Sequence, residues 1–373
     1  MKDTIYTQNR ELSWLRFNER VLEEAREKNV PAFEKLKFIS IFTSNLDEFF
    51  MIRVGSLYDQ TFLPKPQIDN KTGMDAAEQL SEIFRAAAPL YKKRDKIYRE
   101  VAGLLCEKGI AHPQMESLTA EERSFAEKYF IADVLPVLSP QIINAHHPFP
   151  HLVNKALYIV LQMKISDKTA YGIIPMPAMQ DRLIFLPGSG MRYVLLEELI
   201  YQYAERVFDN CEINAKSIIC VTRNADINVD GLPDEDEDFR HHMKKVLRKR
   251  SRLAPVRLEH CGPIHDKLEK FLRGKLELKK EQVFQSSAPL EMSYVFPLLD
   301  KVPDRIRQAV TYVPFEPQVP PWFKTGDSMI DKVMQEDLIL SYPYEQMTPF
   351  LQLIKEAALD PRVLSIKITI YRL

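Results

Sequence analysis

The sequence predicts a multidomain α+β protein in which a helical N-terminal domain precedes a mixed α/β domain. Its 373 residues correspond to two or three domains of ordinary size. The first hundred residues carry apolar side chains at helical spacing, whereas the region from about Leu118 to Val313 mixes helical spacing with strand-like alternation. With 45% hydrophobic and 28% charged residues, the chain can bury real cores, which excludes a mainly disordered protein.

The predicted N-terminal helical domain covers residues 1–108. Three apolar stripes predict its first helices, namely Trp14, Phe17, Val21 and Ala25, then Phe33, Leu36 and Ile39, then Phe49, Ile52 and Ser56. A stretch containing Pro and Asn interrupts the pattern before a long helix expected from Asp75 to Lys108. The segment Gly109–Pro113 is expected to follow the end of this domain.

The predicted head domain covers residues 109–315 and combines both periods. Helices are expected over Glu121–Val134 and Phe239–Arg252. Strands are expected over Leu157–Lys164, Tyr171–Pro175, Leu183–Leu186, Ser217–Thr222 and Pro255–His260. This mixture predicts an α+β or α/β domain.

Residues 316–373 are predicted to be a linker and the start of a third domain. The linker is indicated by Pro314, Pro317, Pro320 and Pro321. A helix over Thr348–Leu359 and an alternating strand over Val363–Tyr371 follow. One apolar strand leaves its edges unpaired, so it either docks on the middle domain or the chain is a fragment. The pattern favours the fragment.

Composition excludes several classes of protein. The net charge of -1 gives no bulk basic field for nucleic acid. The four cysteines form no CxxC pair, which indicates reduced thiols. The N-terminus lacks the apolar run of a signal peptide, and the longest apolar stretch, Ala156–Met163, is too short for a membrane span. We therefore expect a cytoplasmic protein.

Two charged segments have a functional and a structural interpretation. Asp226–Glu237 matches the calcium-loop pattern D-x-N-x-D-G-x5-E, but Pro233 removes a backbone N–H and a strand precedes the loop, so an acidic turn is favoured. The basic helix expected over Phe239–Arg252 could bind a polyanion such as nucleic acid or polyphosphate. It lacks interleaved aromatic residues, and a solvated face is favoured.

Neither histidine cluster predicts a metal site. His146, His147 and His151 lie among prolines that prevent the helix needed for i,i+4 ligation. The cluster within 260–265 is interrupted by Gly-Pro in the same way. There is no phosphate-binding loop of the GxxxxGK[ST] type, in keeping with only 11 glycines.

The segment TSNLDE holds the strongest candidate for phosphate binding. Ser44 with Asp47, or Asn45 with Glu48, has capping-box spacing for a helix predicted over Leu46–Leu57. Asn45 is then an N-cap, or it donates to a phosphate oxygen at the positive end of that helix. Both roles need the same free helix end, and they can coexist.

Five segments in order make the chain resemble the class-1 polyphosphate kinases. The first two resemble the family's N-terminal domain: NRELSWLRFNERVLEEA (Asn9–Ala25) and FEKLKFISIFTSNLDEFFMIRV (Phe33–Val54). LPVLSPQIINAHHPFPHLVNKAL and VTRNADINVD (Val221–Asp230) resemble its head domain. Asp337–Leu373 resembles the opening of its first catalytic domain.

The resemblance implies an enzyme that moves the terminal phosphate of ATP reversibly onto inorganic polyphosphate, through a phosphohistidine and with Mg²⁺. It also implies two catalytic domains similar to the phospholipase D fold, of which this chain would hold the first helix and strand. The family's nucleotide-binding Asn, for ATP or ADP, falls on Asn45. An Arg of its magnesium–phosphate site falls on Arg372, which we expect to clamp phosphate oxygens because a guanidinium cannot ligate a cation.

The same resemblance places the phosphorylated His in a K-I-H-A-K-type motif beyond Leu373. None of the eight histidines here has that context, so we expect this chain alone to be inactive. The alternative is a non-catalytic module that forms a homo-oligomer through the N-terminal and head domains, or that binds a polyanion through the basic helix.

Overall fold

The computed structural model describes residues 7–143, 147–165, 168–188, 190–208, 211–224, 254–324 and 326–370. These residues belong to two compact units, Met1–Tyr312 and Val313–Leu373. The predicted domain limits of 1–108, 109–315 and 316–373 stay predictions.

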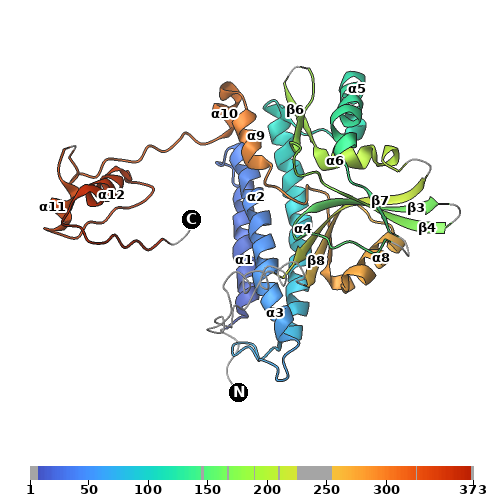
Figure 1. The fold of residues 1–373 in the computed structure, drawn as a ribbon, viewed down its shortest axis with the longest axis horizontal. Coiled ribbons are helices and arrows are strands. Elements are labelled where there is room, and N and C mark those ends of the chain that lie inside the picture. The colour runs from blue at the N-terminus through green and yellow to red at the C-terminus, as the bar shows by residue number, and fades with distance from the viewer. Residues whose placement is uncertain are drawn as a thin grey trace. The chain divides into compact units, whose positions relative to one another are not determined.

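Three long helices lie side by side in the larger unit (Figure 1), namely α1 (Arg10–Glu23), α2 (Ala32–Phe49) and α4 (Ala76–Glu107). The long helix predicted from Asp75 is confirmed, and Asp75 forms a reciprocal capping box with Glu78. The predicted stripe of Phe33, Leu36 and Ile39 is buried, as expected. Helix α2 continues without a break through the π-helical turn η3 (Phe50–Val54) into α3 (Gly55–Gln60).

The buried side of α1 differs from the predicted stripe. The buried positions of α1 are Leu15, Asn18 and Leu22, whereas Phe17 is 53% exposed. The predicted Ala25 is buried in the following turn, residues 24–26. The prediction was wrong for Phe17 because a search for apolar spacing does not consider that an amide side chain, here Asn18, can take the buried position. Asn18 is tolerated inside because its Nδ2 donates to the Phe42 carbonyl oxygen of α2 at 3.0 Å.

A six-stranded sheet packs beside these helices in the order β2-β4-β3-β7-β8-β9. Its strands are β2 (Gln141–Ile143), β3 (Leu157–Ile165), β4 (Lys168–Pro175), β7 (Glu212–Arg223), β8 (Pro255–Cys261) and β9 (Val283–Ser286). A three-stranded sheet has the order β1-β6-β5, from β1 (Ile110–Ala111), β6 (Met191–Leu195) and β5 (Leu183–Phe185). The five predicted strands are confirmed, and the other four are short strands that periodicity did not indicate.

The central strand β3 is buried on both faces. Leu157, Ile159 and Leu161 share a core with helices α5 (Ala120–Tyr129) and α6 (Leu196–Gln202), whose residues include Ala126 and Leu199. Tyr158 and Val160 share a core with α8 (Asp266–Leu276). Because both faces are covered, β3 is a nearly continuous apolar run.

The helices and the sheet share one core where α2 and α4 meet β8 and β9. Phe50 packs edge-on against Phe284 of β9, and Tyr91 of α4 stacks on the same ring at 4.7 Å. Helices α9 (Val295–Lys301) and α10 (Asp304–Val310) complete the larger unit. Its short helical turns are η2 (Glu24–Arg26), η4 (Met115–Ser117), η5 (Phe130–Val134), η6 (Leu135–Val137), η7 (Ala204–Arg206) and η8 (Lys280–Gln282).

The smaller unit contains α11 (Met329–Val333) and α12 (Thr348–Leu359), and the second confirms the predicted helix. The strand predicted over Val363–Tyr371 is wrong across residues 363–370, which form no strand in the described structure. A strand needs a hydrogen-bonded neighbour, and the described part of this unit has no other strand to pair with.

Candidate functional site

Asn45 lies inside helix α2 and caps nothing. The helix runs from Ala32 to Phe49, so the predicted N-cap and the anion site at a free helix end are both wrong. Buried Phe42, Leu46 and Phe49 hold this stretch against the core, and Thr43 Oγ1 donates to the Ile39 carbonyl oxygen at 2.9 Å. Packing has overridden the local preference of Ser and Asn for caps.

The Asn45 amide is fixed by a relay between α1 and α2. Its Nδ2 donates to Asn18 Oδ1 at 3.1 Å, and Asn18 Nδ2 donates to the Phe42 carbonyl oxygen. Asn18 is fully buried and Asn45 is half-buried. Among the described residues Asn45 makes no other hydrogen bond, so its carbonyl oxygen and second N–H are available to a ligand.

Asn45 lines a surface hollow of about 290 Å³, which we call the Asn45 hollow. It is lined by Trp14, Phe17, Asn45, Glu48, Phe49, Ile52 and Arg53. Trp14 and Phe49 stack with centroids 4.4 Å apart and planes 9° from parallel. Aromatic faces stack on nucleobases, an amide hydrogen-bonds to a base edge, and a guanidinium binds phosphate.

Sequence reasoning assigned Trp14 and Phe17 to the core and therefore missed their place in the Asn45 hollow. The missed signal was Asn18, which takes the buried position one residue after Phe17. Arg53 was missed because nothing in the sequence relates it to Trp14. Arg53 lies on η3, which continues the helix that carries Asn45, and the pairing of α1 with α2 brings Trp14 to the same hollow.

The opposite side of α2 is held by a buried ionic network. Asp47 Oδ1 accepts from Arg257 Nη2 of β8 at 2.5 Å, and its Oδ2 pairs with Lys155 Nζ at 3.1 Å. Arg257 also donates to Thr222 Oγ1 at 2.6 Å and to Tyr91 Oη at 2.8 Å. One guanidinium therefore ties α2 to β7, β8 and α4.

Glu259 completes this network. It lies 3.1 Å from Arg257 and accepts a hydrogen bond from Tyr91 Oη at 2.8 Å. Burial would lower the pKa of Arg257, but Glu259, Tyr91 and Asp47 outweigh it and raise that pKa. Burial raises the pKa of Glu259, with Arg257 opposing it.

The described residues offer no metal site. No group of three His, Cys, Asp or Glu side chains among them could hold a metal ion. The segment containing His147 and His151 has no helix, as expected, and the four cysteines are free. Outside the described residues lie Arg372, His146, the acidic segment Asp226–Glu237 and the basic segment Phe239–Arg252.

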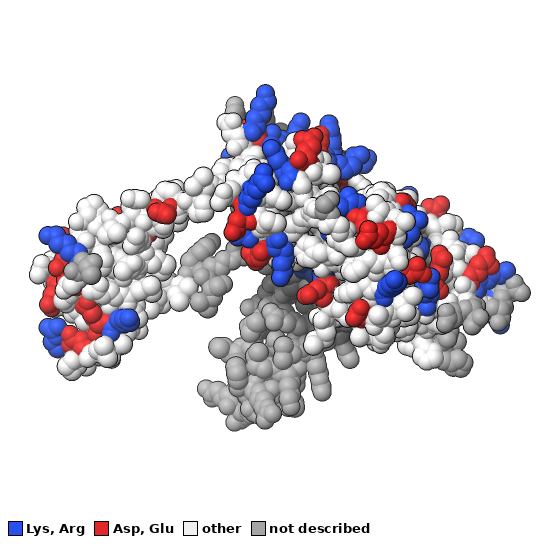
Figure 2. Space-filling view, turned by 90° about the horizontal axis from the view of Figure 1, so that it is seen from above, with Lys and Arg blue, Asp and Glu red and all other residues white. Residues whose placement is uncertain are grey.

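Charges of both signs are interspersed over the face seen in Figure 2, in keeping with the near-zero net charge. Where the structure describes helices, none is both long and apolar enough to cross a lipid bilayer.

Comparisons with known proteins give one family along the whole chain. Family models for the polyphosphate kinase N-terminal domain, middle domain and C-terminal domain 1 match residues 7–112, 121–298 and 328–373. Polyphosphate kinases from Bacillus cereus and Halalkalibacterium halodurans are 37% and 36% identical over 100% of this chain, and 54% and 53% of their own lengths are covered. The chain thus spans about half the length of the curated relatives it matches.

The fold has a solved counterpart in the crystal structure of polyphosphate kinase from Porphyromonas gingivalis. The TM-score is 0.75 at 22% identity, over 95% of this chain and 50% of that one. Three domain models matched in order, with relatives aligned from end to end of the sequence, show that this chain belongs to the polyphosphate kinase family.

Proposed function

We propose that this chain supplies the nucleotide-binding wall of an ATP:polyphosphate phosphotransferase. The observation that carries the proposal is the Asn45 amide, oriented by Asn18 beside the stacked Trp14 and Phe49 rings. The curated relatives are named polyphosphate kinase, and such a hollow suits the base and phosphates of ATP or ADP.

Five side chains of the Asn45 hollow share the binding of a nucleotide in this proposal, namely Trp14, Phe17, Asn45, Phe49 and Arg53. The nucleobase lies against the exposed Phe17 ring and the edge of the Trp14–Phe49 stack. Asn45 hydrogen-bonds to the base edge or ribose, where a fixed amide discriminates between donors and acceptors. Arg53 contacts phosphate oxygens at the exposed side.

We propose that the transfer itself is ping-pong and needs a histidine that this sequence lacks. A neutral imidazole nitrogen attacks the γ-phosphorus, an N–P bond forms, and the bond to the bridging oxygen breaks to release ADP. The end oxygen of polyphosphate then attacks phosphorus and breaks the N–P bond. The resemblance to the family also implies that Mg²⁺ accompanies this transfer.

The nucleotide proposal is tested by Trp14 fluorescence. The chain has two tryptophans, so a Trp322→Phe background isolates Trp14. ADP and ATP should quench it saturably, and Asn45→Ala should weaken binding about tenfold, as expected for loss of one or two hydrogen bonds. Asn214→Ala, an exposed amide on β7, is the control. Unchanged nucleotide affinity in Asn45→Ala would contradict the proposal.

The inactivity of the chain alone is tested by incubating it with γ-phosphate-labelled ATP. We expect neither polyphosphate synthesis nor protein-bound label, since none of the eight histidines has the required context. Acid-labile labelling of these 373 residues would refute this part of the proposal.

A second candidate role is self-association of the chain. It is supported by exposed apolar side chains between α3 and α4, where Phe62 is 71% exposed and Ile68 is 57% exposed. Light scattering should show a dimer or larger species. The double variant Phe62→Ser, Ile68→Ser should weaken this self-association. A strict monomer would remove this role.

We also place the enzyme in the cytoplasm, where its free thiols stay reduced.

A further inference from the structure

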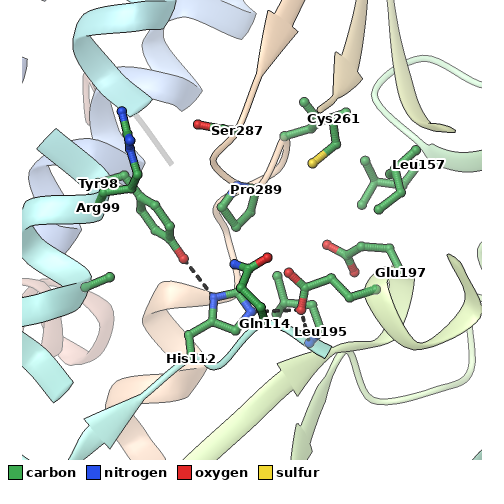
Figure 3. A pocket seen from close by; sticks show the side chains of 14 residues that line it. Tyr98, Arg99, His112, Gln114, Leu157, Leu195, Glu197, Cys261, Ser287 and Pro289 are labelled. Atoms are coloured by element: carbon green, nitrogen blue, oxygen red, sulfur yellow. Dashed lines mark hydrogen bonds and ion pairs between the residues drawn. The ribbon is translucent and has the colours of Figure 1, made fainter. Parts of the chain in front are cut away.

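A cavity of about 310 Å³ lies in the larger unit where α4 and α6 meet the ends of β3 and β8 and the middle of β7 (Figure 3). It shares no lining residue with the Asn45 hollow. Tyr98 and His112 come from the part matched by the N-terminal family model, and Leu157, Glu197 and Cys261 from the part matched by the middle model. Ligand cavities occur preferentially at such junctions.

The cavity has a buried floor and an open rim. Leu157, Ile218 and Leu290 form apolar walls and are at most 7% exposed. Arg99, Gln114 and Ser287 stand at the rim with exposed side chains. A ligand therefore enters past polar groups and buries an apolar part inside.

One end of the floor is a hydrogen-bonded chain of three side chains. His112 Nδ1 lies 2.8 Å from Tyr98 Oη, and His112 Nε2 lies 2.8 Å from Glu198 Oε2. A neutral imidazole that accepts at Nδ1 and donates at Nε2 satisfies both contacts. Glu198 Oε2 also accepts from the Leu195 N–H at 2.9 Å, while Oε1 has no hydrogen bond within the described residues.

Glu197 brings a second carboxylate into the same cavity. It is 3% exposed, and in Figure 3 its carboxylate and the Cys261 sulfur turn toward the same space. Arg182 pairs with it at 2.6 Å, but the same guanidinium also pairs with Glu291. Arg182 thus serves two carboxylates, and Glu198 contacts the His112 ring and the Leu195 N–H instead of a guanidinium.

Two carboxylates, buried Glu197 and Glu198 with a side chain 26% exposed, therefore outnumber the one guanidinium that pairs with Glu197. Burial raises the pKa of the Cys261 thiol to about 12, and the charges of Glu198, Asp95 and Glu197 act in the same direction. An anionic ligand would be repelled by Glu197 and Glu198, and a neutral one would gain little from them.

We propose that this cavity binds a compact organic cation, with a primary ammonium against Glu197 and Glu198 Oε1 and an alkyl chain against Leu157, Ile218 and Leu290. The ammonium supplies three donors to acceptors with spare lone pairs, and such charge-assisted hydrogen bonds are stronger than neutral ones. The proposal does not depend on nucleotide binding at the Asn45 hollow.

The probe is n-butylammonium, titrated into the full chain by calorimetry, with n-butanol and butyrate as isosteres of different charge. We expect saturable one-to-one binding of n-butylammonium, affinity at least about tenfold lower for n-butanol, and no binding of butyrate. Equal binding of n-butylammonium and n-butanol, or no saturable binding of the ammonium, would overturn the proposal.

Two variants locate the binding in the cavity. Ala102→Phe fills the cavity from α4 without changing charge and should abolish binding. Glu198→Gln should weaken binding of n-butylammonium about tenfold, whereas Glu205→Gln, the same change on exposed η7, should not. Unaltered binding in a folded Ala102→Phe protein, with a normal thermal transition, would refute the site even if Glu198→Gln failed to fold.

Discussion

The two faces of helix α2 have opposite environments, although Asn45 and Asp47 are only two residues apart. Asn45 is half-buried, uses one N–H within the protein and borders an open hollow. Asp47 is 6% exposed and bonds to Arg257 and Lys155. The contacts of the Asp47 side fix how α2 is rotated about its own axis. The Asn45 side is therefore left at the surface, where a ligand can replace solvent.

Removing Arg257, which holds the buried face of α2, should have the largest effect on the stability of the protein. Arg257→Met leaves Asp47 and Glu259 buried without their shared guanidinium, and we expect a loss of about 3–5 kcal/mol in the free energy of unfolding. Urea denaturation measures it. Lys155→Met removes a partly exposed partner of Asp47 and should cost no more than about 1 kcal/mol. Equal losses would show that the network is not what fixes α2.

The second largest loss of stability is expected where the buried face of α2 continues into α3. A Cβ on Gly55 would lie 2.3 Å from Asn224 Oδ1, and Asn224 is buried with its Nδ2 donating to the Gly55 carbonyl oxygen. Gly55→Ala should therefore destabilise by about 1–3 kcal/mol. Gly103→Ala, on α4 with open space around it, should stabilise by up to about 1 kcal/mol. Thermal melts that move both variants in the same direction would contradict this contrast.

The third largest effect on stability is expected at Glu259, and it should depend on pH. Its folded-state pKa is raised above 4.5, so between about pH 4.5 and that pKa the folded protein holds a proton that the unfolded chain has released. Stability therefore falls as the pH rises from about 4.5 through the folded pKa. Glu259→Gln should lack this decline in urea melts between acid and neutral pH. Glu281→Gln, on the exposed surface, should retain it.

The outer face should give the smallest change in stability. Asn45→Ala removes one half-buried hydrogen bond to Asn18, and we expect a cost of about 0.5–1.5 kcal/mol. The same variant should change nucleotide affinity, whereas Lys155→Met should not. If chemical denaturation shows a loss in Asn45→Ala as large as that in Arg257→Met, the two faces do not differ in the way described.

Local patterns predicted the elements whose burial is continuous, such as α4 and β3. They also predicted α12, although Pro349 is its only buried residue. They failed at Asn45, because a capping sequence was held within a helix by Phe42, Leu46 and Phe49. They failed at residues 363–370, because alternation gives a strand only beside a partner. They could not have found the pairing of Asp47 with Arg257, since those residues are 210 positions apart and periodicity reports only neighbours.

That 210-residue separation also sets an order of events during synthesis. At about 5–20 residues per second, α2 leaves the ribosome about 10–40 s before the guanidinium that neutralises its buried carboxylate. During that interval Phe50 and Asp47 have no sheet to cover them, so we expect the first helices to form only a loosely packed bundle. We expect residues 7–112 made alone to remain loosely packed and to aggregate. A longer chain that includes β7, β8 and β9 should not aggregate in this way.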